Sequence, residues 1–181
     1  GSDLSATLTD GCTAMMLAGE KEMNALYKAG ADPEATTKRG ATPLIQFLVA
    51  SDSVPPDYLL TPTNLARVCL GHLYHYGYST ALGWAVRFRR SEAVISALVQ
   101  AGADPNGVPE FYNGTASPPK RYLPPLLCAH GTRWPEAVYA LLAMGATVPA
   151  DVETAYGLRD IVIEALVQLR TESIGKRTKR A

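Results

Sequence analysis

Two turns far apart in the chain are nearly identical, and this internal repetition constrains the fold more than any other feature. Gly30-Ala31-Asp32-Pro33-Glu34 returns as Gly102-Ala103-Asp104-Pro105-Asn106, and shorter versions stand at Gly77-Tyr78 and Gly145-Ala146-Thr147. An apolar pattern with helical spacing precedes each turn, so each glycine is predicted to end a helix in a left-handed conformation. The apolar positions are Met23, Leu26, Tyr27, Leu65, Val68, Cys69, Leu73, Val94, Ile95, Leu98, Val99, Val138, Leu141 and Leu142.

A second signature marks where helices begin. Gly40-Ala41-Thr42-Pro43-Leu44-Ile45 places Thr-Pro before an apolar run, and the segments 79–85 and 123–129 likewise place a small residue or a proline before an apolar helix. Thr61-Pro62, Ser91-Glu92 and Pro135-Glu136 are suitable starts for a second helix, since each supplies a cap, a first-turn proline or a first-turn acid. The order of turn, helix, helix and Gly-Ala-Asp resembles the ankyrin repeat, in which Thr-Pro-Leu-His-x-Ala precedes Gly-Ala-Asp by about 20 residues.

This resemblance implies an all-α solenoid of about five helix-pair units, including two capping units, with irregular hairpin loops called fingers. The expected division is residues 1–2 as an expression-tag remnant, 3–172 as the repeat domain (units 5–30, 31–77, 78–102, 103–145 and 146–172) and 173–181 as a flexible basic tail. The array is irregular, because its glycines are 47, 25 and 43 residues apart. We expect a surface insertion at 51–61, a deleted finger between Gly77 and Thr80, and a long finger at 107–122. Counting back from Gly30 predicts first-unit helices near 10–18 and 20–29, and a last pair near 149–156 and 158–171.

Composition sets outer limits on function. The 181 residues carry 17 basic and 17 acidic side chains and are 47% apolar, which argues against disorder, and no apolar run is long enough to span a membrane. The three cysteines are too few for a disulfide framework, so an intracellular, cytoplasmic protein is expected. The tail Lys176-Arg177-Thr178-Lys179-Arg180 is either a nuclear-localisation or nucleic-acid patch or a solubilising linker.

The sequence offers little for catalysis. Cys69, His72 and His75 have a spacing typical of metal ligands. On a helix, however, His72 and His75 would be rotated by about 300° and 240° from Cys69, so the three side chains would not converge on one ion. Cys128 and His130 could form a nucleophile and base, although the repeat pattern places Cys128 on a packed helix face. We therefore predict no enzyme activity, no catalytic residue, no metal site and no cofactor.

The resemblance implies binding through the concave side, at finger bases and at the ends of the first helix of each unit. The positions that match are Lys38, Arg39, Arg87, Phe88, Arg89, Arg90, Lys120, Arg121 and Tyr122, with Phe111 and Tyr112 on the long finger. The basic residues form three short stretches, 38–39, 87–90 and 120–121, and none of these contains an acid. An acidic or phosphorylated protein segment is therefore the favoured partner. Two alternatives stay open: a nucleic-acid or nucleotide-like ligand stacked on Phe88, Tyr122 or Trp84, and self-association within a longer chain. Trp84 is predicted to pack rather than to present a ligand platform.

Overall fold

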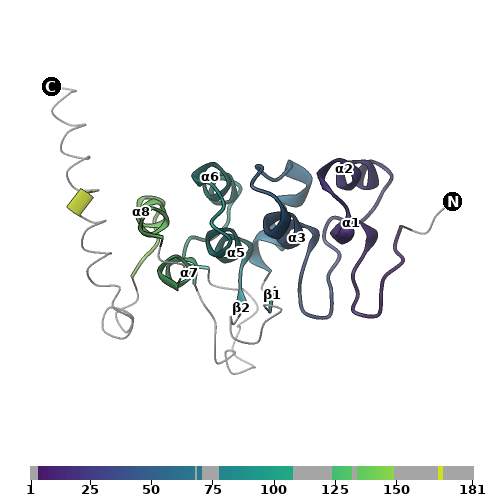
Figure 1. The fold of residues 1–181 in the computed structure, drawn as a ribbon, viewed down its shortest axis with the longest axis horizontal. Helices are drawn as coiled ribbons and strands as arrows, with labels where there is room; N and C mark the ends of the chain where they lie inside the picture. The colour runs from purple at the N-terminus through teal and green to yellow at the C-terminus, as the bar shows by residue number, and fades with distance from the viewer. Residues whose placement is uncertain are drawn as a thin grey trace.

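The computed structural model describes residues 4–67, 69–70, 78–107, 124–131, 134–148 and 167–168. This part of the chain is helical, as predicted. An inner row holds α1 (Ala14–Leu17), α3 (Pro43–Ala50), α5 (Ala81–Arg87) and α7 (Pro125–Gly131). The other helices are α2 (Glu20–Lys28), α4 (Pro62–Ala66), α6 (Glu92–Gln100) and α8 (Pro135–Ala143), with a 3-10 turn η1 (Asp57–Leu59). Figure 1 shows α1, α3, α5 and α7 following one another along the long axis, with α2, α6 and α8 in a second row.

Threonine caps begin several of these helices, as the Thr-Pro signature predicts. The Thr42 hydroxyl accepts a hydrogen bond from the Ile45 N–H at 3.3 Å, and the Thr61 hydroxyl accepts one from Asn64 at 3.2 Å. Thr80 caps α5 in the same way, through the Gly83 N–H at 3.4 Å. Each bond satisfies an N–H that has no partner within its own helix.

Left-handed glycines end α2, α6 and α8, which confirms the predicted helix stops. The φ angles of Gly30, Gly102 and Gly145 are 97°, 105° and 97°. After α6, the Gly102 N–H donates to the Val99 carbonyl and the Ala103 N–H donates to the Leu98 carbonyl, and the other two helices close with the same pair of bonds. The alanine after each glycine is buried. The chain therefore leaves each of these three helices in the same direction.

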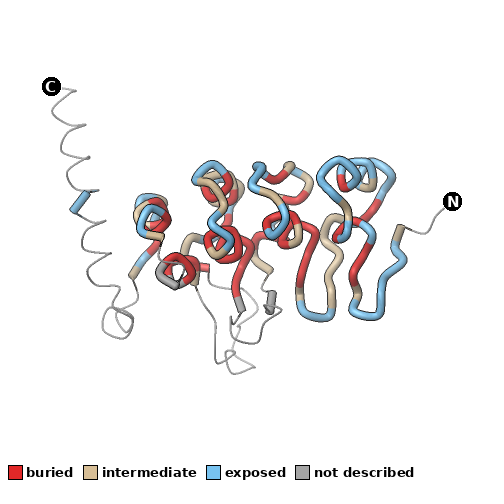
Figure 2. The backbone as a smooth tube through the Cα atoms, viewed as in Figure 1, coloured by how far each residue is buried: buried red, intermediate tan, exposed pale blue. Residues whose placement is uncertain are grey.

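The core lies between the two rows of helices and runs along the whole described array (Figure 2). Leu44 and Leu48 of α3, Leu82 and Val86 of α5, and Leu98 of α6 have no exposed surface. No helix in the described ranges is long and apolar enough to cross a membrane.

The prediction that the second unit's outer helix continues through Cys69 is wrong, and Leu73 lies outside the described residues. Helix α4 ends at Ala66, and Arg67 already has extended backbone angles (φ −69°, ψ 138°). Strand β1 (Cys69–Leu70) then pairs antiparallel with β2 (Tyr78–Ser79), so a pair of strands precedes Thr80 where we expected a deleted finger. Four apolar residues at helical spacing were a weak signal, and pairing between the two segments replaced the helical hydrogen bonds.

Two other expectations need correction. The first inner helix begins at Ala14 and not near residue 10, because Gly11 is left-handed (φ 86°) and the Cys12 N–H bonds the Asp10 carboxylate at 3.0 Å in a turn. The insertion 51–61 is not wholly a surface loop, since Leu59 of η1 has no exposed surface and packs in the core. The predicted last helix pair lies outside the described residues except for Val167–Gln168, which are helical, and the predicted tail lies wholly outside them.

Gly102→Ala tests the left-handed helix stop. A Cβ at Gly102 would meet no atom within 4 Å, so the only cost is conformational, and the free energy of unfolding should fall by about 1–2 kcal/mol. Denaturant unfolding measures this loss. Gly102→Asn is the control: asparagine enters the left-handed region more readily than alanine, so its loss should be clearly smaller. Equal effects of the two substitutions would contradict the assignment.

Candidate functional site

The predicted binding residues divide into two exposed groups and one undescribed group. Lys38 and Arg39 are exposed on the second finger (residues 32–41), which leads into α3. Phe88 and Arg89 are exposed at the end of α5, where Arg87 and Arg90 are partly buried. Phe111, Tyr112, Lys120, Arg121 and Tyr122 lie outside the described residues.

Aromatic rings and guanidinium groups stack together at the end of α5. The rings of Trp84 and Phe88 lie 5.8 Å apart at 23°, as residues one helical turn apart can. The guanidinium carbon of Arg87 lies 5.8 Å from the Trp84 ring centroid, and that of Arg90 lies 5.9 Å from the Phe88 ring centroid. These distances suit cation–π contacts. We call Trp84, Arg87, Phe88 and Arg90 the arginine–aromatic cluster.

Trp84 forms the base of this cluster. Its side chain is only 6% exposed and packs against Ala41 and Ile45, so the prediction that it packs is confirmed. Phe88 is 38% exposed and is the aromatic ring of the cluster that solvent reaches most. A ligand that docks here would therefore touch Phe88 and the arginines, while Trp84 supports them from below.

The turn after α5 positions the arginines through an unusual backbone conformation. Arg89 has φ 51°, the left-handed region that glycine fills after α2, α6 and α8. The Arg89 N–H donates to the Val86 carbonyl and the Arg90 N–H to the Ala85 carbonyl, the same two bonds that close the other helices. A non-glycine residue in this region is strained, and such strain gathers at functional sites.

Side-chain bonds hold the turn against the end of α3. Arg90 Nη2 donates to the Val49 carbonyl at 3.4 Å, and a carboxylate oxygen of Asp52 accepts from the Ser91 N–H at 2.6 Å. Two buried donors of the cluster, Trp84 Nε1 and Arg90 Nε, have no acceptor among the described residues. The cluster is therefore rich in positive charge and hydrogen-bond donors.

A cavity of about 620 Å³ lies between the first finger (residues 4–12) and the second finger, and sequence reasoning missed it. It is lined by Thr9, Asp10, Cys12, Met16, Leu17, Thr37, Lys38, Arg39, Ala41 and Gln46. A hydrogen bond of 2.8 Å from the Lys38 N–H to the Asp10 carbonyl joins the two fingers. Because Ala41 both lines this cavity and packs against Trp84, the cavity adjoins the arginine–aromatic cluster. We call it the inter-finger cavity.

The inter-finger cavity combines apolar surface with a basic rim. Met16 is buried, whereas Leu17 at the end of α1 is 67% exposed. Lys38 and Arg39 stand on one side, with Asp10 on the other. An exposed leucine at a helix end is too common to signal a site from sequence.

The described residues show no group of three or more histidine, cysteine or acidic side chains that could hold a metal. Cys69 lies in strand β1 and not on a helix, so the rotation that a helix would give between Cys69, His72 and His75 does not occur at Cys69. His72 and His75 are outside the described residues.

Cys128 of α7 is a core residue, as the repeat pattern predicts. Its side chain is 3% exposed, and its sulfur lies 3.7 Å from the Ser79 Oγ. Burial raises the pKa of the Cys128 thiol to about 11, although the Ser79 hydrogen bond and the Arg87 charge both act to lower it. The thiol is therefore neutral near pH 7, which does not suit a nucleophile.

Comparison with protein-family models found no match, and comparison with curated proteins found no relative. The function must therefore be argued from the residues themselves.

The raised pKa of Cys128 predicts alkaline destabilisation. Below the ordinary thiol pKa of 9.0, both the folded and the unfolded chain keep the proton; above it, only the unfolded chain releases it. Relative to Cys128→Ala, the wild type should therefore lose roughly 2 kcal/mol of unfolding free energy between pH 8 and pH 11. Denaturant unfolding at several pH values measures the difference. Parallel pH curves for the two proteins would refute the buried neutral thiol.

Arg89→Gly should relieve the strain after α5. Glycine tolerates φ 51° at no steric cost but loses more chain entropy on folding, so we expect a net gain of up to about 1 kcal/mol in unfolding free energy. Arg87→Gly is the matched control, because the same change inside α5 should destabilise. An Arg89→Gly variant less stable than the wild type would rule out the strained turn.

Proposed function

We propose that this chain is an ankyrin-like solenoid that works as a non-enzymatic protein-binding module. Its support is the recurring local chemistry: threonine caps at Thr42 and Thr80, and left-handed glycines at Gly30, Gly102 and Gly145. Helix pairs that bury their faces against neighbouring pairs form a stiff array. A stiff surface loses little conformational entropy when a partner binds.

The favoured partner is a protein segment that carries acidic or phosphorylated residues. The observation that carries this proposal is the arginine–aromatic cluster with Arg89 beside it, where cations gather around the half-exposed Phe88. Guanidinium groups bind carboxylates and phosphates through paired hydrogen bonds, and an exposed aromatic ring adds apolar contact area. An apolar side chain of the same segment would enter the inter-finger cavity. Lys38 and Arg39 would then lie beside the acidic residues of the bound segment.

The nucleic-acid alternative has less support. Stacking on bases needs exposed rings, and Trp84 is 6% exposed. Phe88 remains available, and Tyr122 lies outside the described residues. Self-association is the other alternative, and it is tested by the molar mass of the protein in solution.

Selection from a displayed random peptide library tests the protein-binding proposal. Peptides selected on the wild type should be enriched in aspartate and glutamate next to an apolar residue. For these peptides, Arg87→Glu/Phe88→Ala should weaken binding at least ten-fold by fluorescence polarisation, because it reverses a charge and removes the exposed ring. Leu17→Asp should also weaken binding, through the inter-finger cavity.

Lys21→Glu on the outer helix α2 is the matched control, since it reverses an exposed charge away from the site. Its binding should match the wild type, and every variant should remain folded at the assay temperature, although loss of the contacts with Trp84 lowers the melting temperature of the double variant by a few degrees. Selected peptides without acidic residues, or unchanged affinity in the double variant, would overturn the proposal. Tighter binding of single-stranded oligothymidine than of any selected peptide, with a steep salt dependence, would favour the nucleic-acid alternative.

A further inference from the structure

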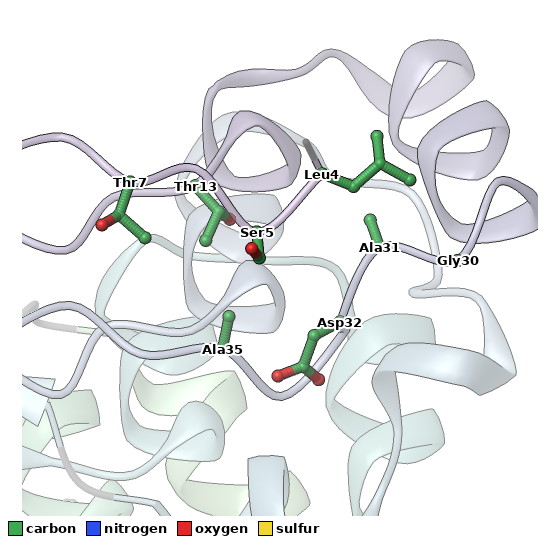
Figure 3. Close-up of a pocket in the computed structure, with 8 residues that line it drawn as sticks. All are labelled: Leu4, Ser5, Thr7, Thr13, Gly30, Ala31, Asp32 and Ala35. Atoms are coloured by element: carbon green, nitrogen blue, oxygen red, sulfur yellow. The ribbon is translucent and has the colours of Figure 1, made fainter. Parts of the chain in front are cut away.

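A second cavity, of about 460 Å³, opens between the first finger and the turn after α2 (Figure 3). It is lined by Leu4, Ser5, Thr7, Thr13, Gly30, Ala31, Asp32 and Ala35. None of these residues lines the inter-finger cavity, so the two cavities are separate. Its polar lining consists of hydroxyl groups and one carboxylate, with no cation.

One buried hydroxyl in this cavity lacks a partner. Thr13 is 6% exposed, yet its Oγ1 makes no hydrogen bond within the described chain. The hydroxyls of Thr42 and Thr80 cap the helices that follow them, whereas that of Thr13 does not cap α1. In Figure 3 the Thr13 side chain extends from the upper loop into the space above Ala35. A buried hydroxyl without a partner is costly, so a ligand that bonds it would bind favourably.

Further along the chain, a side-chain carboxamide lies at the place that corresponds to this cavity. Asn106 follows Gly102 by four residues, and its Oδ1 accepts hydrogen bonds from the Thr147 N–H at 2.7 Å and the Thr147 hydroxyl at 2.9 Å. Thr147 occupies the same place after Gly145 that Asp32 occupies after Gly30. A second carboxamide, that of Asn64, donates a hydrogen bond to the Pro33 carbonyl at 2.9 Å, in the turn that follows α2.

At the first turn, Ser5 stands where Asn106 stands later. The first two fingers match with an offset of 29 residues: the Leu8 N–H bonds the Cys12 carbonyl as Thr37 bonds Ala41, and Gly11 and Gly40 have φ of 86° and 81°. Residue 5 therefore corresponds to Glu34, and through the repeated Gly-Ala-Asp-Pro turn to Asn106. Ser5 presents a hydroxyl at this position and not the carboxamide that Asn106 presents. The Asp32 N–H, which corresponds to the bonded Thr147 N–H, donates to no backbone carbonyl of the described residues.

We propose that this cavity binds the carboxamide of an asparagine or glutamine side chain from a protein partner. The amide oxygen accepts from the Asp32 N–H, as Asn106 Oδ1 accepts from Thr147, and the amide nitrogen donates to the Thr13 hydroxyl. The Asp32 carboxylate disfavours an anionic side chain. The specificity of this cavity therefore differs from that of the arginine–aromatic cluster and the inter-finger cavity. The proposal does not depend on the function proposed above.

Titration of the ¹⁵N-labelled chain with N-acetyl-asparagine N-methylamide tests the site by NMR. The backbone amide signals of Asp32 and Thr13 should shift in a saturable way. The aspartate and leucine analogues of the same probe should produce shifts at least three-fold smaller at equal concentration. Equal shifts with the leucine analogue, or no shift at Asp32, would overturn the proposal.

Two variants separate this site from nonspecific binding. Ser5→Asn should fill the cavity from within and abolish the saturable shift, whereas Ser53→Asn, an exposed serine outside the cavity, should leave it unchanged. Thr13→Val keeps the side-chain shape but removes the hydroxyl, and it should weaken probe binding at least five-fold without lowering the melting temperature, because that hydroxyl makes no bond. Unchanged probe binding in both Ser5→Asn and Thr13→Val would also overturn the proposal.

Discussion

The left-handed turn at the end of an outer helix is the constraint on which the array depends. After α2, α6 and α8, a glycine with positive φ lets two N–H groups return to the last carbonyls, and the next residue, an alanine, is buried. This closure sets the direction in which each finger leaves its helix. The finger after α2 then leads into α3, which begins at the Thr42 cap and buries its apolar residues against its neighbours.

The same closure appears after α5 with a different residue, and there it serves the candidate site. Arg89 adopts the conformation that glycine adopts elsewhere, and Arg90 then folds back over Phe88 and onto the Val49 carbonyl. The turn thus accepts local strain and concentrates cations beside an exposed ring. The first finger departs from the repeated pattern in another way. Ser5 stands at the position where Asn106 bonds the next turn, and a cavity lies beside it. Both departures from the repeated pattern coincide with proposed binding positions, as expected where function competes with local regularity.

Much of the helical array could be predicted because its signals are local. Thr42 and Thr61 bond N–H groups three residues away, and the turn at Gly102 and Ala103 bonds the carbonyls of Val99 and Leu98, three and four positions before the glycine. The end of the second unit's outer helix could not be predicted, since the helical pattern there competes with a strand pair whose partners are eight and ten residues apart. The place of Leu59 in the core also needed tertiary information, because an insertion rich in proline and aspartate looks like a surface loop from sequence.

By itself, the sequence determined the helical class, the helix starts at threonine and the helix stops at glycine, since caps and backbone conformation depend on neighbouring residues. It also placed Lys38, Arg39 and the arginines after α5 at exposed or partly exposed positions. The sequence predicted that Trp84 packs, but only the tertiary structure decided that it supports Phe88 and the arginines, and that Met16 and Leu17 lie beside Lys38 in one cavity. The cavity with the unpartnered Thr13 hydroxyl is likewise a product of packing between neighbouring fingers. Contacts between residues nearly 30 positions apart depend on how the fingers stack, and no short stretch of sequence specifies that geometry.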